Sequence, residues 1–161
     1  TRDQEEALTM SDTVVVMNNG HSQQIGSPTD IYNEPVNAFV ADFIGESNIL
    51  NGCMPRDCLV EFCGKQFECV DKGFSPNETI DVVIRPEDIK VIPAAEAKLT
   101  GIVESVVFKG VHYEIIVDIK GFKWMIQSTD FVDVDEKIGI YIEPDAIHIM
   151  KKSEYSYIIM R

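Results

Sequence analysis

The segment VVIRPEDIKVI at residues 82–92 has a counterpart further along the chain, IYIEPDAIHIM at residues 140–150. Each copy consists of an apolar stretch, a charged residue, a proline, an acidic residue and then an isoleucine within a second apolar stretch. A proline cannot donate a hydrogen bond to a strand ladder, so Pro86 and Pro144 are expected at a strand exit or a sheet edge. The repeat predicts two related β units that each end in the same corner, with a chance similarity between two β corners as the alternative.

The chain from Glu46 onward predicts a mainly β fold. Short runs rich in Ile, Val and Phe alternate with Gly, Pro, Asp and Asn. The stretch VFKGVHYEIIVDIKGFKWMI at residues 107–126 predicts three consecutive antiparallel strands that turn at Gly110 and Gly121. Many short, evenly spaced strands are typical of small barrels and sandwiches. The expected strands span residues 58–63, 66–70, 79–85, 89–92, 99–108, 111–119, 122–128, 137–142 and 146–150.

The residue pattern of the first 45 positions differs from that of the rest of the chain and predicts a few short helices around one hairpin. Asp3, followed three residues later by Glu6, fits a capping box at a helix start. The pair Asn19-Gly20, between the runs TVVVM and HSQQIG, predicts a tight turn between two strands. The expected helices lie within residues 1–10, 27–35 and 37–45. The change of residue pattern after residue 45 predicts two domains, residues 1–45 and 46–161.

The composition is that of a globular protein with an acidic surface. The 161 residues include 14 Lys and Arg against 27 Asp and Glu, for a net charge of −13. Affinity for a nucleic-acid backbone comes mainly from Lys and Arg, so this charge argues against a nucleic-acid partner. It is compatible with cationic partners, although a solvated acidic surface is the simpler interpretation. No apolar run is long enough for a membrane span, and no signal-peptide pattern is present.

The four cysteines, Cys53, Cys58, Cys63 and Cys69, do not form a CxxC pair. Zinc sites usually use closely spaced cysteine pairs, so a metal is not expected here. The spacing around Gly64 favours a strand, a turn and a returning strand, with Cys58 on the same face as Val60. Reduced thiols that behave as small hydrophobic side chains are the favoured interpretation and suit the cytosol, with a disulfide as the alternative.

The opening of the chain resembles the ATP-binding subunit of ATP-binding-cassette (ABC) importers. The resemblance rests on TRDQEEALTMSDTVVVMNNGHSQQIGSPTDIYNEP and FVADFIGESN within residues 1–50. Within the family, DIYNEP followed by FVADFIGESN is most similar to spermidine/putrescine importers. RPEDI at residues 85–89 resembles the signature of the β-rich regulatory domain of that family, the TOBE domain. The resemblance implies an OB-like β-barrel regulatory domain that follows a remnant of an α/β ATPase domain. The signature residues would be Arg85, Pro86, Glu87 and Asp88.

The resemblance also implies what the chain lacks. The phosphate-binding pattern G-x-x-x-x-G-K-[ST] and the LSGGQ-like signature are not in this sequence. ATP and magnesium would belong to the longer protein, and the chain alone is expected to hold no cofactor and to have no catalytic residue. Arg2 occupies the position of the histidine that contacts the γ-phosphate in the family. The resemblance further implies a bacterial protein on the cytoplasmic face of the membrane, paired with permease subunits and dimerised through its regulatory domains.

Two further functions are considered for the β region. The first is a sensor of cytoplasmic polyamine, in which carboxylates along a groove and an aromatic face would bind a linear cation. Its candidate residues are Asp133, Asp135, Glu136, Glu143, Asp145 and Trp124, with Glu87, Asp88, Asp130 and Tyr141 as further members of the group. Solvated turns are the simpler interpretation of these acids. The second is the ATPase subunit of an importer for another substrate, such as iron, sulfate or a sugar. We interpret three histidines as structural: His21, His112 and His148. The C-terminal tail presents one face, made of Tyr155, Tyr157 and Ile159, which is expected either to bind a partner or to pack on the protein itself.

Overall fold

The computed structural model describes residues 13–18, 21–27 and 47–152. The chain divides into two compact units, one made of Thr1–Glu46 and Met150–Arg161, the other of Ser47–Ile149. The helices expected before residue 46 lie outside the described residues. So do Arg2 and the tail residues Tyr155, Tyr157 and Ile159. The predicted domain boundary between residues 45 and 46 stays a prediction.

The first unit contains the predicted hairpin. Strand β1 (Val14–Asn18) pairs antiparallel with β2 (His21–Gly26), and Asn18 lies opposite His21 at the turn. This pairing confirms the two strands expected on either side of Asn19-Gly20. Val15 and Ile25 are paired in the register, and their side chains are 47% and 64% exposed. One face of the hairpin therefore carries exposed apolar side chains.

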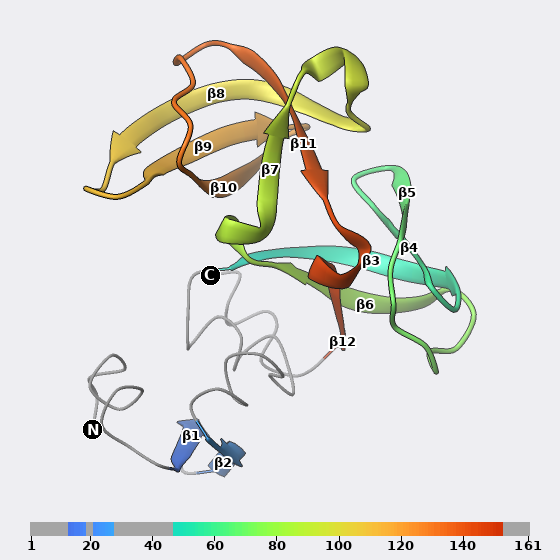
Figure 1. The fold of residues 1–161 in the computed structure, drawn as a ribbon. Helices are drawn as coiled ribbons and strands as arrows, with labels where there is room; N and C mark the ends of the chain where they lie inside the picture. The colour runs from blue at the N-terminus through green and yellow to red at the C-terminus, as the bar shows by residue number, and fades with distance from the viewer. Residues whose placement is uncertain (1–12, 19–20, 28–46, 153–161) are drawn as a thin grey trace. The chain divides into compact units, whose positions relative to one another are not determined.

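The second unit is built from two five-stranded sheets (Figure 1). Sheet 1 has the strand order β12-β6-β3-β4-β5, and sheet 2 has the order β10-β9-β8-β11-β7. The strands of sheet 1 are β3 (Asn48–Arg56), β4 (Leu59–Phe62), β5 (Lys65–Glu68), β6 (Glu78–Ile84) and β12 (His148–Lys151). Those of sheet 2 are β7 (Ile89–Ile92), β8 (Leu99–Phe108), β9 (Tyr113–Ile119), β10 (Phe122–Ser128) and β11 (Lys137–Ile142). The expected strands from residue 58 onward are thereby confirmed, with small shifts at their ends.

The repeated segments adopt the same local structure. In each, a strand is followed by a short 3-10 helix that begins at the proline: η1 (Pro86–Asp88) after β6, and η3 (Pro144–Ala146) after β11. The residues before the prolines match as well, since Arg85 has φ −76° and ψ 141° and Glu143 has φ −64° and ψ 147°. A residue before proline is restricted to this extended region.

The two corners carry the chain between the sheets. The first corner connects β6 of sheet 1 to β7 of sheet 2, and the second connects β11 of sheet 2 to β12 of sheet 1 (Figure 1). Strand β7 then pairs with β11, and β6 lies next to β12. Each copy of the repeat therefore contributes one strand to each sheet, so the two β units are intertwined.

Strand β3 was not among the expected strands. It is a central strand between β6 and β4, although it contains Gly52 and Pro55, which both disfavour a strand interior. Tertiary packing requires the glycine, because a Cβ atom at Gly52 would lie 2.7 Å from the carbonyl oxygen of Glu61 on the neighbouring strand. Pro55 lies near the end of the strand, where a register shift between Cys53 and Arg56 interrupts the pairing with β4.

The predicted turns are confirmed. Cys63-Gly64 joins β4 to β5 and Lys120-Gly121 joins β9 to β10, and all four residues have positive φ, as a two-residue hairpin turn of this type requires. The β8–β9 turn is wider. There the amide of Lys109 donates to the carbonyl of His112 at 2.8 Å, and Gly110 has a φ of 94°.

One contiguous core fills the space between the two sheets. Val60, Phe62 and Ile80 enter it from sheet 1, and Val117 and Trp124 enter it from sheet 2. The Trp124 ring lies 6.4 Å from the Phe62 ring and so links the two sheets directly. The mainly β, OB-like class expected from the sequence is confirmed. Among the residues that the structure describes, no helix has the length and apolar character needed to cross a membrane.

Candidate functional site

The signature residues lie at the junction of the two corners. Arg85 precedes η1, His148 begins β12, and Nη1 of Arg85 lies 3.3 Å from Nε2 of His148. The guanidinium is only a donor, so this hydrogen bond requires an unprotonated Nε2 on the histidine. Because the chain passes between the sheets at both corners, two residues that lie 63 positions apart in the sequence come together here.

Acidic side chains surround this pair. Asp71, in the segment after β5, accepts a hydrogen bond at Oδ2 from the amide of Ile149 at 3.3 Å. Burial raises the pKa of Asp71, and it also raises the pKa of Asp88 in η1, where Glu87 adds to the rise. Burial lowers the pKa of His148, and Arg85 lowers it further, against the opposing effect of Asp71 and the other nearby acids. The junction is thus a half-buried network of opposite charges.

The sequence identified part of this junction. It singled out Arg85, Pro86, Glu87 and Asp88, and the structure places all four at the first corner. Asp145 belongs to the equivalent corner and acts electrostatically on both His148 and Asp88. The contribution of Asp71 was missed, and no local pattern marks it, because its contacts are with residues far away in the sequence. The role of His148 could have been found from the repeat, which aligns it with Lys90.

A cavity of about 290 Å³ lies between β5 of sheet 1 and the β7–β8 and β11 segments of sheet 2. Its lining is mostly apolar, with two carboxylates and one ammonium group. The lining includes Phe67, Glu68, Glu96, Lys98 and Tyr141. Lys98 donates to the carbonyl of Gln66 at 2.8 Å and lies 5.1 Å from the centre of the Phe67 ring.

Glu143 is placed beside this cavity. Its Oε2 accepts a hydrogen bond from the hydroxyl of Tyr141 at 3.2 Å, and its Oε1 forms an ion pair with Lys90 at 3.2 Å. Lys90 also lies 5.9 Å from the centre of the Tyr141 ring. The pKa of Tyr141 is raised, chiefly by the charge of Glu143. One of the predicted acids and the predicted aromatic partner Tyr141 therefore do come together.

The other predicted acids lie elsewhere. Asp133, Asp135 and Glu136 form an exposed turn before β11, which is held to β8 by backbone hydrogen bonds between Asp135 and Val103 and between Val103 and Glu136. Trp124 is fully buried in the core, and its indole N–H has no hydrogen-bond partner among the residues that the structure describes. The predicted polyamine-binding residues are thus distributed over four places: this turn, the cavity rim, the corner junction and the core.

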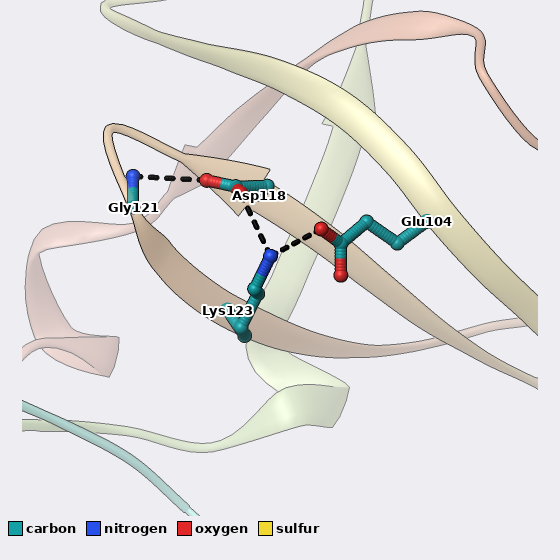
Figure 2. Close-up of polar contacts among 4 residues, drawn as sticks. All are labelled: Glu104, Asp118, Gly121 and Lys123. Atoms are coloured by element: carbon teal, nitrogen blue, oxygen red, sulfur yellow. Dashed lines mark hydrogen bonds and ion pairs between the residues drawn. The ribbon is translucent and has the colours of Figure 1, made fainter.

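A second charged group lies on the exposed face of sheet 2 (Figure 2). Lys123 on β10 forms ion pairs with Asp118 on β9 and Glu104 on β8, and Asp118 also accepts a hydrogen bond from the amide of Gly121 at 2.9 Å. The hydrogen bond from Lys123 holds the pKa of Asp118 below its ordinary value. All three side chains are solvated, so this group is a surface ion-pair network with no enclosed space for a ligand.

Within 13–18, 21–27 and 47–152, no three His, Cys, Asp or Glu side chains are grouped so that they could hold a metal ion.

Comparisons with known proteins agree with the architecture. Residues 82–150, which contain both corners, match the family model of the TOBE domain. The crystal structure of the cytoplasmic molybdate-binding protein ModG with molybdate bound superposes with a TM-score of 0.55 over 65% of this chain and 96% of that one. Its sequence identity is 11%, so this likeness concerns the fold alone.

Curated relatives match almost the whole chain. A spermidine/putrescine import ATP-binding protein PotA of Desulfitobacterium hafniense is 65% identical over 152 residues, and one of Acetivibrio thermocellus is 62% identical over 154. A third, from Bacteroides thetaiotaomicron, is 59% identical over 153 residues. The matches cover 94%, 96% and 94% of this chain, but only 44%, 44% and 33% of the relatives. The chain therefore carries a TOBE domain and matches, along nearly its whole length, the C-terminal part of the ATP-binding subunit of spermidine/putrescine ABC importers.

Proposed function

We propose that this chain is the regulatory region of an ATP-binding subunit that drives polyamine import. The observation that carries the proposal is the 65% identity over 152 residues to a spermidine/putrescine import ATP-binding protein. In the longer protein, ATP and magnesium would bind in the preceding ATPase domain, and hydrolysis would power uptake through permease subunits. The protein would then act at the cytoplasmic face of the membrane, bound to those subunits. The apolar face of the β1–β2 hairpin, with Val15 and Ile25 exposed, supports a neighbouring domain there.

The test of this proposal is a transport assay with the full-length gene. Cells that lack their own polyamine uptake, supplied with this gene and its permease partners, are expected to accumulate labelled spermidine or putrescine in an ATP-dependent way. Excess unlabelled spermidine should compete with the label, whereas sulfate, ferric iron and maltose should not. Uptake of one of those three solutes without polyamine uptake would assign the subunit to another class of importer.

Within this function we propose that the regulatory region also forms a homodimer. The supporting observation is an aromatic patch, made of Phe108, Tyr113 and Phe131, in which Phe108 and Phe131 are 61% and 60% exposed. Val111, next to it in the β8–β9 turn, is 82% exposed. Contiguous exposed aromatics of this kind are typical of protein–protein interfaces.

Sedimentation of the purified protein tests the dimer. Replacing Phe108 and Phe131 by Asp is expected to shift the protein from dimer to monomer. The control is Val70→Asp, which changes an equally exposed apolar residue outside the patch. A wild-type protein that stays monomeric at high micromolar concentration would contradict the proposal, as would a double variant that stays dimeric.

A second candidate function is polyamine sensing, and the cavity is the observation that favours it. The mostly apolar cavity is lined by the carboxylates of Glu68 and Glu96. A third carboxylate, that of Glu143, lies beside it next to Tyr141. Carboxylates attract ammonium groups, and an aromatic ring offers a cation–π contact to them. Calorimetric titration with spermidine at low salt is expected to show binding that Glu143→Gln weakens and Asp135→Asn does not. An absence of heat would remove this candidate and leave the transport function untouched.

A further inference from the structure

Two cysteines occupy opposed positions at the base of the β4–β5 hairpin. The ladder pairs Leu59 with Glu68, so the next pair outward is Cys58 and Cys69. The amide of Cys69 donates to the carbonyl of Cys58 at 3.0 Å, which extends the ladder to this pair. The amide of Cys58 donates to the carbonyl of Asp71, also at 3.0 Å, so both cysteines are anchored through their backbones.

The backbone separation expected for this pair suits a disulfide. Hydrogen-bonded residue pairs of an antiparallel ladder have Cα atoms about 5.5 Å apart, and disulfides join Cα atoms about 4.4–6.8 Å apart. Cys58 lies in the β3–β4 turn and has a φ of 62°, so the disulfide would join this turn to the residue that follows β5. Both thiols are free in the structure.

The environments of the two thiols differ in a way that suits sequential reaction. Cys58 is partly exposed and can meet a reagent from solvent, whereas Cys69 is buried, with 4% of its surface exposed. Burial raises the pKa of Cys69, a hydrogen bond from the amide of Asp71 lowers it, and the nearby Cys58 raises it again.

We propose that Cys58 and Cys69 form a reversible disulfide when the protein meets a small-molecule disulfide such as oxidised glutathione. The Cys58 thiolate attacks one sulfur of the reagent, whose S–S bond breaks and releases one thiolate. Cys69 then loses its proton to solvent, attacks the Cys58 sulfur and displaces the second thiolate. Two electrons pass from the protein to the reagent, and the two protons end on the two released thiols. An excess of small thiol reverses the same steps.

The site links thiol oxidation to the cavity. Strand β5, between Cys63 and Cys69, carries Phe67 and Glu68, which line the cavity. A disulfide at the base of the hairpin ties that strand to the β3–β4 turn. The segment after Cys69 is in turn held to β12 by the hydrogen bond between Asp71 and the amide of Ile149. Oxidation would therefore stiffen one wall of the cavity and the segment that contacts the corner junction.

The test is peptide mapping after treatment with oxidised glutathione at pH 8, followed by an acid quench and alkylation of the remaining thiols. Cleavage after Arg56, Lys65 and Lys72, combined with cleavage after Glu61 and Glu68, places Cys58, Cys63 and Cys69 on separate peptides. We expect a linked pair of peptides, residues 57–61 and 69–72, at about ten-fold or more the yield of any other pair. Reduction with excess dithiothreitol should release both.

Variants separate this pair from the other cysteines. Cys58→Ser should abolish the link, whereas Cys53→Ser and Cys63→Ser should retain it. Because Cys69→Ser changes a buried position, its folding must be checked by the fluorescence of Trp124, and the conclusion rests on the Cys58 variant. A dominant link between Cys63 and Cys69 would overturn the proposal. So would a folded wild-type protein that stops at the glutathione adduct of Cys58 or shows no link.

Discussion

At the residue scale, Lys120 occupies a backbone conformation that most side chains adopt only at a cost. It is the first residue of the Lys120-Gly121 turn and has a φ of 52°. Asn is the side chain best tolerated there, and Asn-Gly is the preferred pair for this turn. We predict that Lys120→Asn raises the free energy of unfolding by about 0.5 kcal/mol or more, measured by urea denaturation.

The same substitution has one cost and one matched control. It removes the exposed hydrogen bond from Lys120 to the carbonyl of Cys63, and such exposed contacts contribute little. Lys120→Val is the control, because a β-branched residue is disfavoured at positive φ, and it should lower stability. Equal effects of Asn and Val would show that backbone strain at this turn is unimportant.

The Arg85–His148 contact predicts a pH dependence of stability. The unfolded chain binds a proton at His148 with the ordinary pKa of 6.5, whereas the folded chain binds it only at lower pH. Between these two values the unfolded state binds more protons, so this histidine lowers the free energy of unfolding as the pH falls below 6.5. His148→Gln, which keeps an acceptor for Arg85, should remove that part of the loss.

Asp71 and Asp88 affect stability in a lower pH range than His148 does, and their effect on the free energy of unfolding has the opposite sign. Their pKa values are raised from 3.8, so just above that pH the folded state binds more protons, and their contribution to stability grows as the pH falls toward it. Thermal unfolding measured between pH 4 and pH 8 separates the two ranges. His112→Gln, in the β8–β9 turn, is the control. A His148→Gln variant with an unchanged profile below pH 6.5 would contradict the assignment.

At the element scale, one side chain connects a central strand of sheet 1 to an edge strand of sheet 2. Asn48 of β3 donates from Nδ2 to the carbonyl of Met125 at 2.9 Å, and its Oδ1 accepts from the amide of the same residue at 2.8 Å. Nδ2 also lies 3.3 Å from the carbonyl of Ile84 on β6. The Asn48 amide thus pairs with edge strand β10 as a neighbouring strand would.

Removal of this amide should be costly. Asn48 is 3% exposed, so Asn48→Ala leaves backbone groups of Met125 without partners in a part-buried position. We predict a loss of about 2 to 3 kcal/mol in the free energy of unfolding. Arg56→Ala, on the same strand but at an exposed position, should change it by less than about 0.5 kcal/mol. Chemical denaturation of both variants, at matched concentration, is the measurement, and equal losses would contradict the role given to Asn48.

The elements differ in how far the sequence predicted them. The corners at Pro86 and Pro144 were predictable because a proline restricts the backbone on both sides of its own bond. The turns at Gly64 and Gly121 were predictable for a similar local reason. Strand β3 was not, because its glycine and proline disfavour a strand locally and only the close approach of Glu61 explains Gly52. The corner junction follows the same division, since Arg85 has a local signature and Asp71 has none.

At the scale of the whole second unit, the chain passes from one sheet to the other at each corner. Sheet 1 therefore contains β12, which the chain reaches only after it has built all of sheet 2. The core is also shared, with Phe62 of sheet 1 close to Trp124 of sheet 2. Neither sheet can bury its inner face or complete its strand order alone. Residues 47–149 are thus expected to unfold as one cooperative unit.

Met54→Ala tests that cooperativity. Met54 lies on β3 of sheet 1 and is 1% exposed, so its truncation should cost about 3 kcal/mol through lost burial and a residual cavity. Trp124 is the single tryptophan of the chain and lies on β10 of sheet 2, so its fluorescence reports on the other sheet. If the unit is cooperative, the Trp124 transition and the far-ultraviolet circular dichroism transition shift together to lower denaturant concentration in Met54→Ala. A Trp124 transition that stays at the wild-type midpoint while the dichroism splits into two steps would show that the sheets unfold separately. The passage of the chain between the sheets at the proline corners would then not couple the stabilities of the two sheets.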